Sequence, residues 1–292
     1  MLPTTPAPFP PGKLLIPVLH LIRPPGDGDD ASIAAHVLSQ AHLARSCGAD
    51  GFALCPSERL SLSAKLAAAA AVASAFPTLP LTINFMCGVD EALDCVPPYC
   101  HLWTDKGVDS RGLAAEVHSA LAARPLAARR AERGWRGVWL AGFFHKGGQR
   151  DFSLDDGALV RLAAAVAEMS ELPITTGAGT GVAPLPAELA RLRVALAAAA
   201  SPAPAPRLAC ASGIMLENVG PALPVVDVFF VATGIERATA DPAVLDFYLS
   251  AGLPANAAVD VGFLDAEKTR ALAAAIHAFG GGAPPPAPSP PL

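Results

Sequence analysis

The chain lacks the features that mark membrane-spanning, secreted or nucleic-acid-binding proteins. Of its 292 residues, 16% are charged and 6% are aromatic. No basic stretch carries interleaved aromatic side chains on which bases could stack. The net charge of −5 offers no bulk attraction for nucleic acid. No apolar run reaches the roughly 18 residues needed to cross a bilayer. We therefore expect no nucleic-acid partner and no membrane span.

The six cysteines form no CxxC pair, and several lie in apolar, strand-like runs. A reduced thiol behaves there as a small hydrophobic group, which is typical of a reducing, cytoplasmic compartment. Cys95, Cys100 and His101 are close in sequence, but their spacing matches no standard zinc pattern. We therefore predict no metal site. The first residues also lack the basic and apolar regions of a secretory signal.

The sequence does contain enough apolar residues for a large core, since 52% of its residues are hydrophobic. Proline-rich stretches at 1–12 and 281–292 predict a flexible arm and a flexible tail. Between them, residues 13–280 contain no stretch typical of an interdomain linker. We therefore expect a single domain, and the sequence leaves its oligomeric state open, a homo-oligomer included.

Apolar, β-branched runs alternate with helical patterns along this domain. Strands are predicted within 14–22, 50–57, 79–88, 99–107, 135–148, 172–181, 207–219 and 226–237. Helices are predicted at 31–48, 61–76, 90–95, 111–133, 154–170, 186–200 and 266–279. The alternation favours parallel strands with right-handed crossovers. Eight such units predict a (β/α)8 TIM barrel. A doubly wound open sheet is the alternative, but its glycine fingerprint would follow the first strand.

The last three strand candidates end in a small hydroxyl residue and glycine, followed by a helix-like start. A glycine turn leaves backbone N–H groups free at a helix N-terminus, where the helix dipole favours an anion. Turns after the seventh and eighth strands are the usual phosphate site of a TIM barrel. The alternative is that these glycines only permit tight turns. The predicted substrate-binding residues here are Thr176, Gly177, Gly179, Ser212, Gly213, Thr233 and Gly234.

Titratable and polar residues follow the other strands, where the chemistry of a barrel is located. Asp105, His145 and Lys146 are the predicted catalytic residues for acid–base chemistry. His20, Asn84 and Lys106 are predicted to contact the substrate. Each has a structural alternative. Asp105 could cap the following helix, and His20 could be a core histidine. Lys146 could be a solvated turn residue or an imine-forming lysine. Asn84 could form a hydrogen bond to a neighbouring strand end.

Several motifs together resemble the BtpA family. They are IPVLHLIRPPGD at 16–27, GADGFALCPS at 48–57, TTGAGTG at 175–181, ASGIMLENV at 211–219 and ATGIE at 232–236. The resemblance implies a TIM barrel of the phosphate-binding type. The family takes its name from a link to photosystem I accumulation, and its biochemical activity is poorly defined. The chain departs from the family at Cys55-Pro56-Ser57, where an acidic residue and asparagine are common, and at Glu236-Arg237, where a lysine is common.

These features predict an enzyme that binds a phosphorylated small molecule, either a sugar phosphate or a nucleotide. Its chemistry would be of the isomerase, lyase or glycosyl- or ribosyl-transfer type. One alternative is a non-enzymatic, BtpA-like assembly or regulatory factor. The other is a flavin-binding barrel, because the phosphate of FMN uses the same kind of turn.

Overall fold

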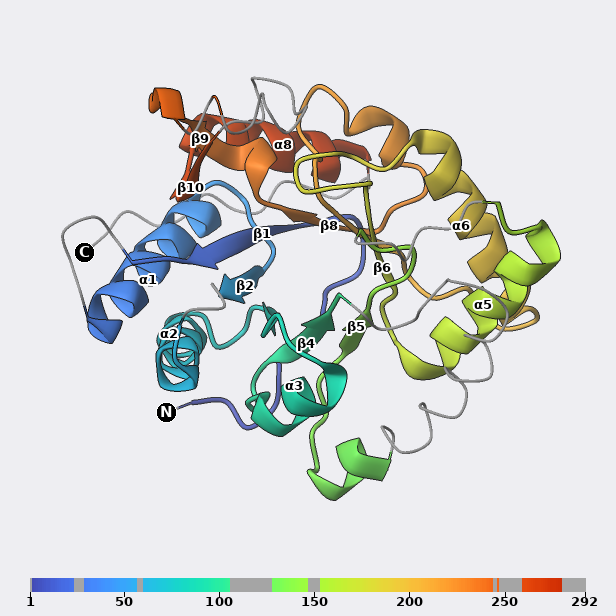
Figure 1. Cartoon of the computed structure of the whole chain (residues 1–292), viewed down its shortest axis with the longest axis horizontal. Helices are drawn as coiled ribbons and strands as arrows, with labels where there is room; N and C mark the ends of the chain where they lie inside the picture. The colour runs from blue at the N-terminus through green and yellow to red at the C-terminus, as the bar shows by residue number, and fades with distance from the viewer. Residues whose placement is uncertain are drawn as a thin grey trace.

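Eight parallel strands with intervening helices form the molecule (Figure 1). The structure is a computed structural model that describes residues 2–23, 29–56, 60–105, 128–146, 153–243, 246 and 259–279. The barrel strands are β1 (Leu14–Leu21), β2 (Phe52–Pro56), β3 (Leu81–Ile83), β4 (His101–Thr104), β5 (Trp139–Ala141), β6 (Ile174–Thr176), β7 (Ala209–Ala211) and β8 (Val228–Val231). Each lies within its predicted run, and the runs are longer because they include loop residues.

The strands pair in the order β5-β4-β3-β2-β1-β8-β7-β6. The two edge strands meet at a parallel bridge between Gly142 and Ile174, where Phe143 N donates to Ile174 O at 2.8 Å. Thr175 Oγ1 adds a bond to Phe144 O at 3.1 Å. The sheet is therefore nearly closed on itself, and the predicted single-domain (β/α)8 barrel is confirmed.

The helices begin at capping residues that the sequence supplies. They are α1 (Asp30–Ser46), α2 (Leu62–Ala75), α3 (Val89–Cys95), α5 (Asp156–Met169), α6 (Pro186–Ala200) and α8 (Ala266–Phe279). The side chains of Asp29, Ser61 and Asp155 accept from the first turns of α1, α2 and α5. The helix predicted at 111–133 lies mostly outside the described residues, of which 128–132 are helical.

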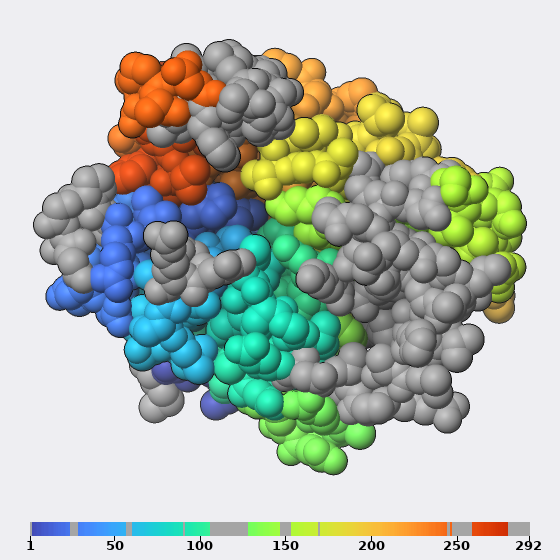
Figure 2. Space-filling model, viewed as in Figure 1, coloured from blue at the N-terminus to red at the C-terminus, as the bar shows by residue number. Residues whose placement is uncertain are grey.

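No α-helix directly follows the glycine turns after β7 and β8 in the described residues. Three-residue 3₁₀ turns stand there instead, η1 (Gly220–Ala222) and η2 (Thr233–Ile235). The sequence also gave no sign of an antiparallel pair, β9 (Glu236–Ala238) with β10 (Val259–Leu264). This pair leads into α8, which lies beside β1 and α1 (Figure 1). Figure 2 likewise shows red and orange C-terminal atoms against blue N-terminal ones.

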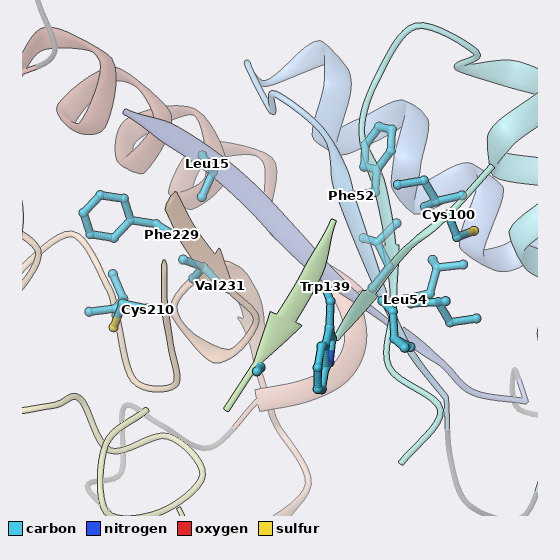
Figure 3. Packing of buried hydrophobic residues seen from close by; sticks show 14 of the residues in the cluster. Leu15, Phe52, Leu54, Cys100, Trp139, Cys210, Phe229 and Val231 are labelled. Atoms are coloured by element: carbon cyan, nitrogen blue, oxygen red, sulfur yellow. The ribbon is translucent and has the colours of Figure 1, made fainter. Parts of the chain in front are cut away.

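The core has two parts, on the two faces of the sheet. One fills the space between strands and helices, and Figure 3 shows Leu15, Phe229 and Val231 from β1 and β8 gathered there. The other fills the barrel interior, where Ile16, Trp103 and Phe230 are buried. The barrel centre is therefore packed with side chains, which leaves its ends for ligand binding.

The arm at residues 2–12 packs against the N-terminal ends of the strands. The Phe9 ring stacks on the His101 ring with centroids 4.6 Å apart. His101 Nε2 lies 2.8 Å from Ala7 O, and Arg207 donates to Pro10 O and Gly12 O. These contacts anchor residues that the sequence led us to expect as a flexible arm. The predicted tail at 281–292 lies outside the described residues.

Burial of His101 predicts a pH-dependent stability. Burial lowers the pKa of His101 from 6.5 to about 4, and Val138 N donates to its Nδ1 at 2.9 Å. Between these two pH values the unfolded chain binds a proton that the folded chain does not. The stability that comes from burying a neutral His101 is therefore fully present above pH 6.5. It is lost as the pH falls towards 4, which lowers the free energy of unfolding by roughly 3 kcal/mol.

Urea unfolding of the wild type and of His101→Gln between pH 7.5 and 4.5 measures this contribution. We expect the stability advantage of the wild type over the variant to shrink as the pH falls. A difference that stays constant with pH would contradict the neutral, buried state of His101.

Candidate functional site at the barrel mouth

A pocket of about 80 Å³ opens at the C-terminal ends of the strands. It has room for a small group of the size of a few water molecules. Its lining comes from both halves of the sheet and comprises Val18, His20, Cys55, Trp103, Lys146, Thr180, Gly181, Ala211, Ser212, Gly213, Phe230, Ala232 and Thr233. We call this the mouth pocket.

The two late glycine turns are adjacent, and each is packed against the backbone of a neighbouring loop. A Cβ atom added to Gly213 would lie 2.2 Å from Ala183 N, and one added to Gly234 would lie 2.0 Å from Ile214 O. Backbone, rather than side chains, therefore surrounds these turns on the side where a Cβ would project. Both positions require glycine, as the tight-turn interpretation predicted, and both also border a pocket.

The Ser212-Gly213 turn leaves its amides without acceptors. In the described part of the chain, neither the Ser212 N–H nor the Gly213 N–H donates a hydrogen bond, so no internal acceptor competes with a ligand for them. Ser212 has φ +69°, in the left-handed region. The other described non-glycine residues with positive φ are Met86 at +58° and Phe144 at +54°, which also follow barrel strands. Such backbone conformations cost free energy and cluster at binding sites.

Lys146 supplies the cation of the mouth pocket. Its backbone N donates to Thr176 Oγ1 at 2.7 Å, and its Nζ donates to Thr180 Oγ1 at 3.1 Å. Thr176, the last residue of β6, and Thr180, in the loop after it, therefore hold the lysine. Lys146 lines the same pocket as the Ser212-Gly213 turn.

Asp105, Asn84 and His145 form an acid–base cluster after β4, β3 and β5, with Asn84 hydrogen-bonded to Asp105 and His145 close to it. Asn84 Nδ2 donates to Asp105 Oδ1 at 2.8 Å. Met86 N donates to Asn84 Oδ1 at 2.9 Å, which fixes the orientation of the Asn84 side chain. His145 Nε2 lies 3.4 Å from the same Asp105 oxygen. Burial lowers the pKa of His145, against the opposing effect of Asp105, so the ring is neutral near pH 7. A neutral imidazole beside a carboxylate can accept or relay a proton.

His20 is paired with a buried carboxylate. Its Nδ1 lies 3.0 Å from Glu236 Oε1, which also accepts from Gly262 N at 2.7 Å. Glu236 is 1% exposed, whereas 27% of the His20 side chain is exposed. Through Glu236, the β9–β10 pair is thus bonded to a residue of the mouth pocket.

Cys55 also lines this pocket, but it is not activated. Burial, and secondarily Asp105, raises the pKa of its thiol to about 12. The thiol therefore stays protonated near pH 7 and is a poor nucleophile.

The structure brings five of the predicted residues to the mouth pocket: His20, Lys146, Ser212, Gly213 and Thr233. Gly234 instead borders a neighbouring pocket of about 130 Å³ with Thr233, Met215, Leu216, Glu217 and Lys268. Gly177 and Gly179 lie in the loop that places Thr180 and Gly181 at the mouth pocket. Lys106 lies outside the described residues.

Sequence reasoning did not assign a role to Thr180, Gly181, Trp103, Glu236 or Lys268. Thr180 and Gly181 belong to the glycine-rich run TTGAGTG, and that run was the available signal. Trp103 lies on β4, two residues before Asp105, so the inward alternation of β4 could have indicated it. Glu236 and Lys268 reach the site through the β9–β10 pair and α8, whose contacts are distant in sequence.

No three His, Cys, Asp or Glu side chains in the described residues are grouped so that they could hold a metal ion. None of the helices in these ranges has the length and apolar character needed to span a membrane.

Comparison with known proteins defines the class of fold. No protein-family model matches the chain, and no curated protein matches it. The solved structure of (S)-3-O-geranylgeranylglyceryl phosphate synthase from Thermoplasma acidophilum, in complex with its substrate sn-glycerol-1-phosphate, covers 91% of this chain and 93% of its own at 15% identity and a TM-score of 0.52. A native KDPGal structure covers 91% of this chain and 95% of its own at 12% identity and a TM-score of 0.51. These similarities establish a (β/α)8 barrel.

Proposed function

We propose that this barrel is an enzyme that binds a phosphorylated small molecule at the mouth pocket. One observation supports this most: Ser212, Gly213 and Lys146 line the same pocket. Free N–H donors and a cation together form a binding site for an anion. A synthase with a phosphorylated substrate shares the fold, which is consistent with the proposal.

In this proposal, Asp105 and His145 perform the acid–base step beside the bound phosphate ester. The neutral His145 ring takes up a proton, and Asp105 stabilises the imidazolium that results. Asn84 positions the Asp105 carboxylate through the bond at 2.8 Å. Such a pair fits the isomerase, lyase and glycosyl- or ribosyl-transfer reactions expected from the sequence. We retain membership of the BtpA family as part of this proposal, because its motifs coincide with β1, β2 and the three late strands.

Calorimetric titration with inorganic phosphate and with ribose 5-phosphate tests the binding site. We expect saturable binding of both, and Lys146→Gln should weaken it about tenfold, because a hydrogen bond to a charged group contributes roughly 1.5–3 kcal/mol. Arg136→Gln is the matched control, since it removes one exposed positive charge just before β5, at the opposite end of the barrel. Equal weakening by both variants would show that Lys146 acts only through the net charge of the protein. No binding at millimolar ligand would refute the site.

A further inference from the structure

Two buried ring nitrogens near the mouth pocket have no hydrogen-bond partner in the described structure, Trp103 Nε1 and His145 Nε2. Trp103 is 7% exposed and His145 is 1% exposed. A buried polar group without a partner costs roughly 1–3 kcal/mol, so each such group needs an explanation. Both residues belong to the end of the barrel where a ligand is expected.

The chain contains two other tryptophans, and both are satisfied. Trp135 Nε1 donates to Cys100 O at 2.9 Å, and Trp139 Nε1 donates to Thr104 Oγ1 at 2.9 Å. Trp103 is the tryptophan that lines the mouth pocket. The tryptophan whose indole N–H has no acceptor is therefore the one that lines the pocket, while the two tryptophans away from the pocket both have acceptors.

The two unpartnered nitrogens lie on rings that contact each other. The centroids of the Trp103 and His145 rings are 6.4 Å apart, and the rings are inclined at 67°. An indole nitrogen can only donate a hydrogen bond. Each nitrogen of the His145 ring has an oxygen nearby, since Nδ1 lies 3.4 Å from Lys146 O and Nε2 lies 3.4 Å from Asp105 Oδ1.

The carboxylate of Asp105 accounts for His145 Nε2, because a proton on Nε2 faces Asp105 Oδ1 at 3.4 Å. Trp103 Nε1 has no acceptor among the described residues, so it requires one from the ligand. A hydroxyl group supplies an acceptor.

We propose that the ligand of the mouth pocket carries a hydroxyl group that accepts from Trp103 Nε1. This inference rests on the proposed function, because the phosphate site anchors the other end of the ligand. It narrows the ligand class to phosphate monoesters that bear a free hydroxyl group, as in polyol and sugar phosphates.

A matched ligand series tests the proposal on the full-length protein. ω-Hydroxyalkyl phosphates of two to five carbons are compared with n-alkyl phosphates having the same number of non-hydrogen atoms. At the chain length that reaches Trp103, we expect the hydroxyl compound to bind at least about tenfold more tightly. In ¹⁵N–¹H spectra, the Trp103 indole resonance should move with the hydroxyl ligand, while those of Trp135 and Trp139 serve as internal controls.

The Trp103→Phe variant assigns the Trp103 indole resonance. It should abolish the preference for hydroxyalkyl over alkyl phosphates while inorganic phosphate still binds. The ligand comparison on the wild type stands even if this variant does not fold. Phosphate binding with less than a twofold preference at every chain length would overturn the hydroxyl subsite and leave the proposed function intact. No binding of inorganic phosphate would overturn both.

Discussion

Replacing Gly213 by alanine lowers the free energy of unfolding by about 4 kcal/mol in our expectation. Gly213 has φ +63°, where an L-residue pays roughly 1–2 kcal/mol. The new Cβ would also lie 2.2 Å from Ala183 N, on a backbone atom that no side-chain rotation can move. Overpacking of this kind costs a further 1–3 kcal/mol or so. Thermal unfolding should show a drop in Tm of roughly 10 °C.

Gly134→Ala is the matched control for this prediction. Gly134 has φ +61°, and nothing lies within 4 Å of the Cβ position. It therefore isolates the backbone term, and we expect a loss of only about 1–2 kcal/mol. Similar losses in the two variants would show that the turn after β7 is not packed against the loop after β6 as described.

Replacing Glu236 by alanine also has a large expected effect, a loss of about 4 kcal/mol in stability. Glu236 Oε1 is the shared acceptor of His20 Nδ1 and Gly262 N, and each hydrogen bond to a charged group contributes roughly 1.5–3 kcal/mol. Chemical denaturation measures the loss. Hydrogen exchange should rise at Gly262 first, because its amide loses the only acceptor that the described structure gives it.

Two variants separate the causes of this effect. Glu236→Gln keeps an oxygen acceptor for Gly262 N and should cost much less than the alanine variant. Glu132→Ala removes an exposed carboxylate of the same length and should change the stability by less than about 0.5 kcal/mol. An alanine effect at position 236 no larger than that at 132 would show that the His20–Glu236 pair does not support the barrel mouth.

Local sequence patterns were sufficient to predict the barrel. A buried parallel strand is a short apolar run, and the runs alternate with capped helices, so neither the strands nor their order required distant contacts. Polar residues at strand ends were predicted to meet for the same reason. Asn84, Asp105 and His145 come from three neighbouring strands and are indeed brought together.

The rest depended on pairings that no local pattern contains. β9 and β10 are separated by some twenty residues, and their pairing brings Glu236 to Gly262, a contact that no local pattern predicts. The proline-rich arm gave no sign that Phe9 stacks on a histidine at position 101. In the loop after β6, a Cβ on Gly177 would lie 1.7 Å from Val182 O, and this close approach folds the loop so that Thr180 and Gly181 line the pocket.

The join between β5 and β6 divides the site in two. Asp105 and His145 belong to one edge of the sheet, and the Ser212-Gly213 turn belongs to the half that begins at the other edge. Only a short run of bonds spans the join, among them Lys146 N to Thr176 Oγ1 at 2.7 Å and Thr175 Oγ1 to Phe144 O at 3.1 Å. Any movement of the barrel at this join would change the spacing between the Asp105–His145 pair and the proposed anion site, so the two threonine hydroxyls fix the geometry of the proposed site.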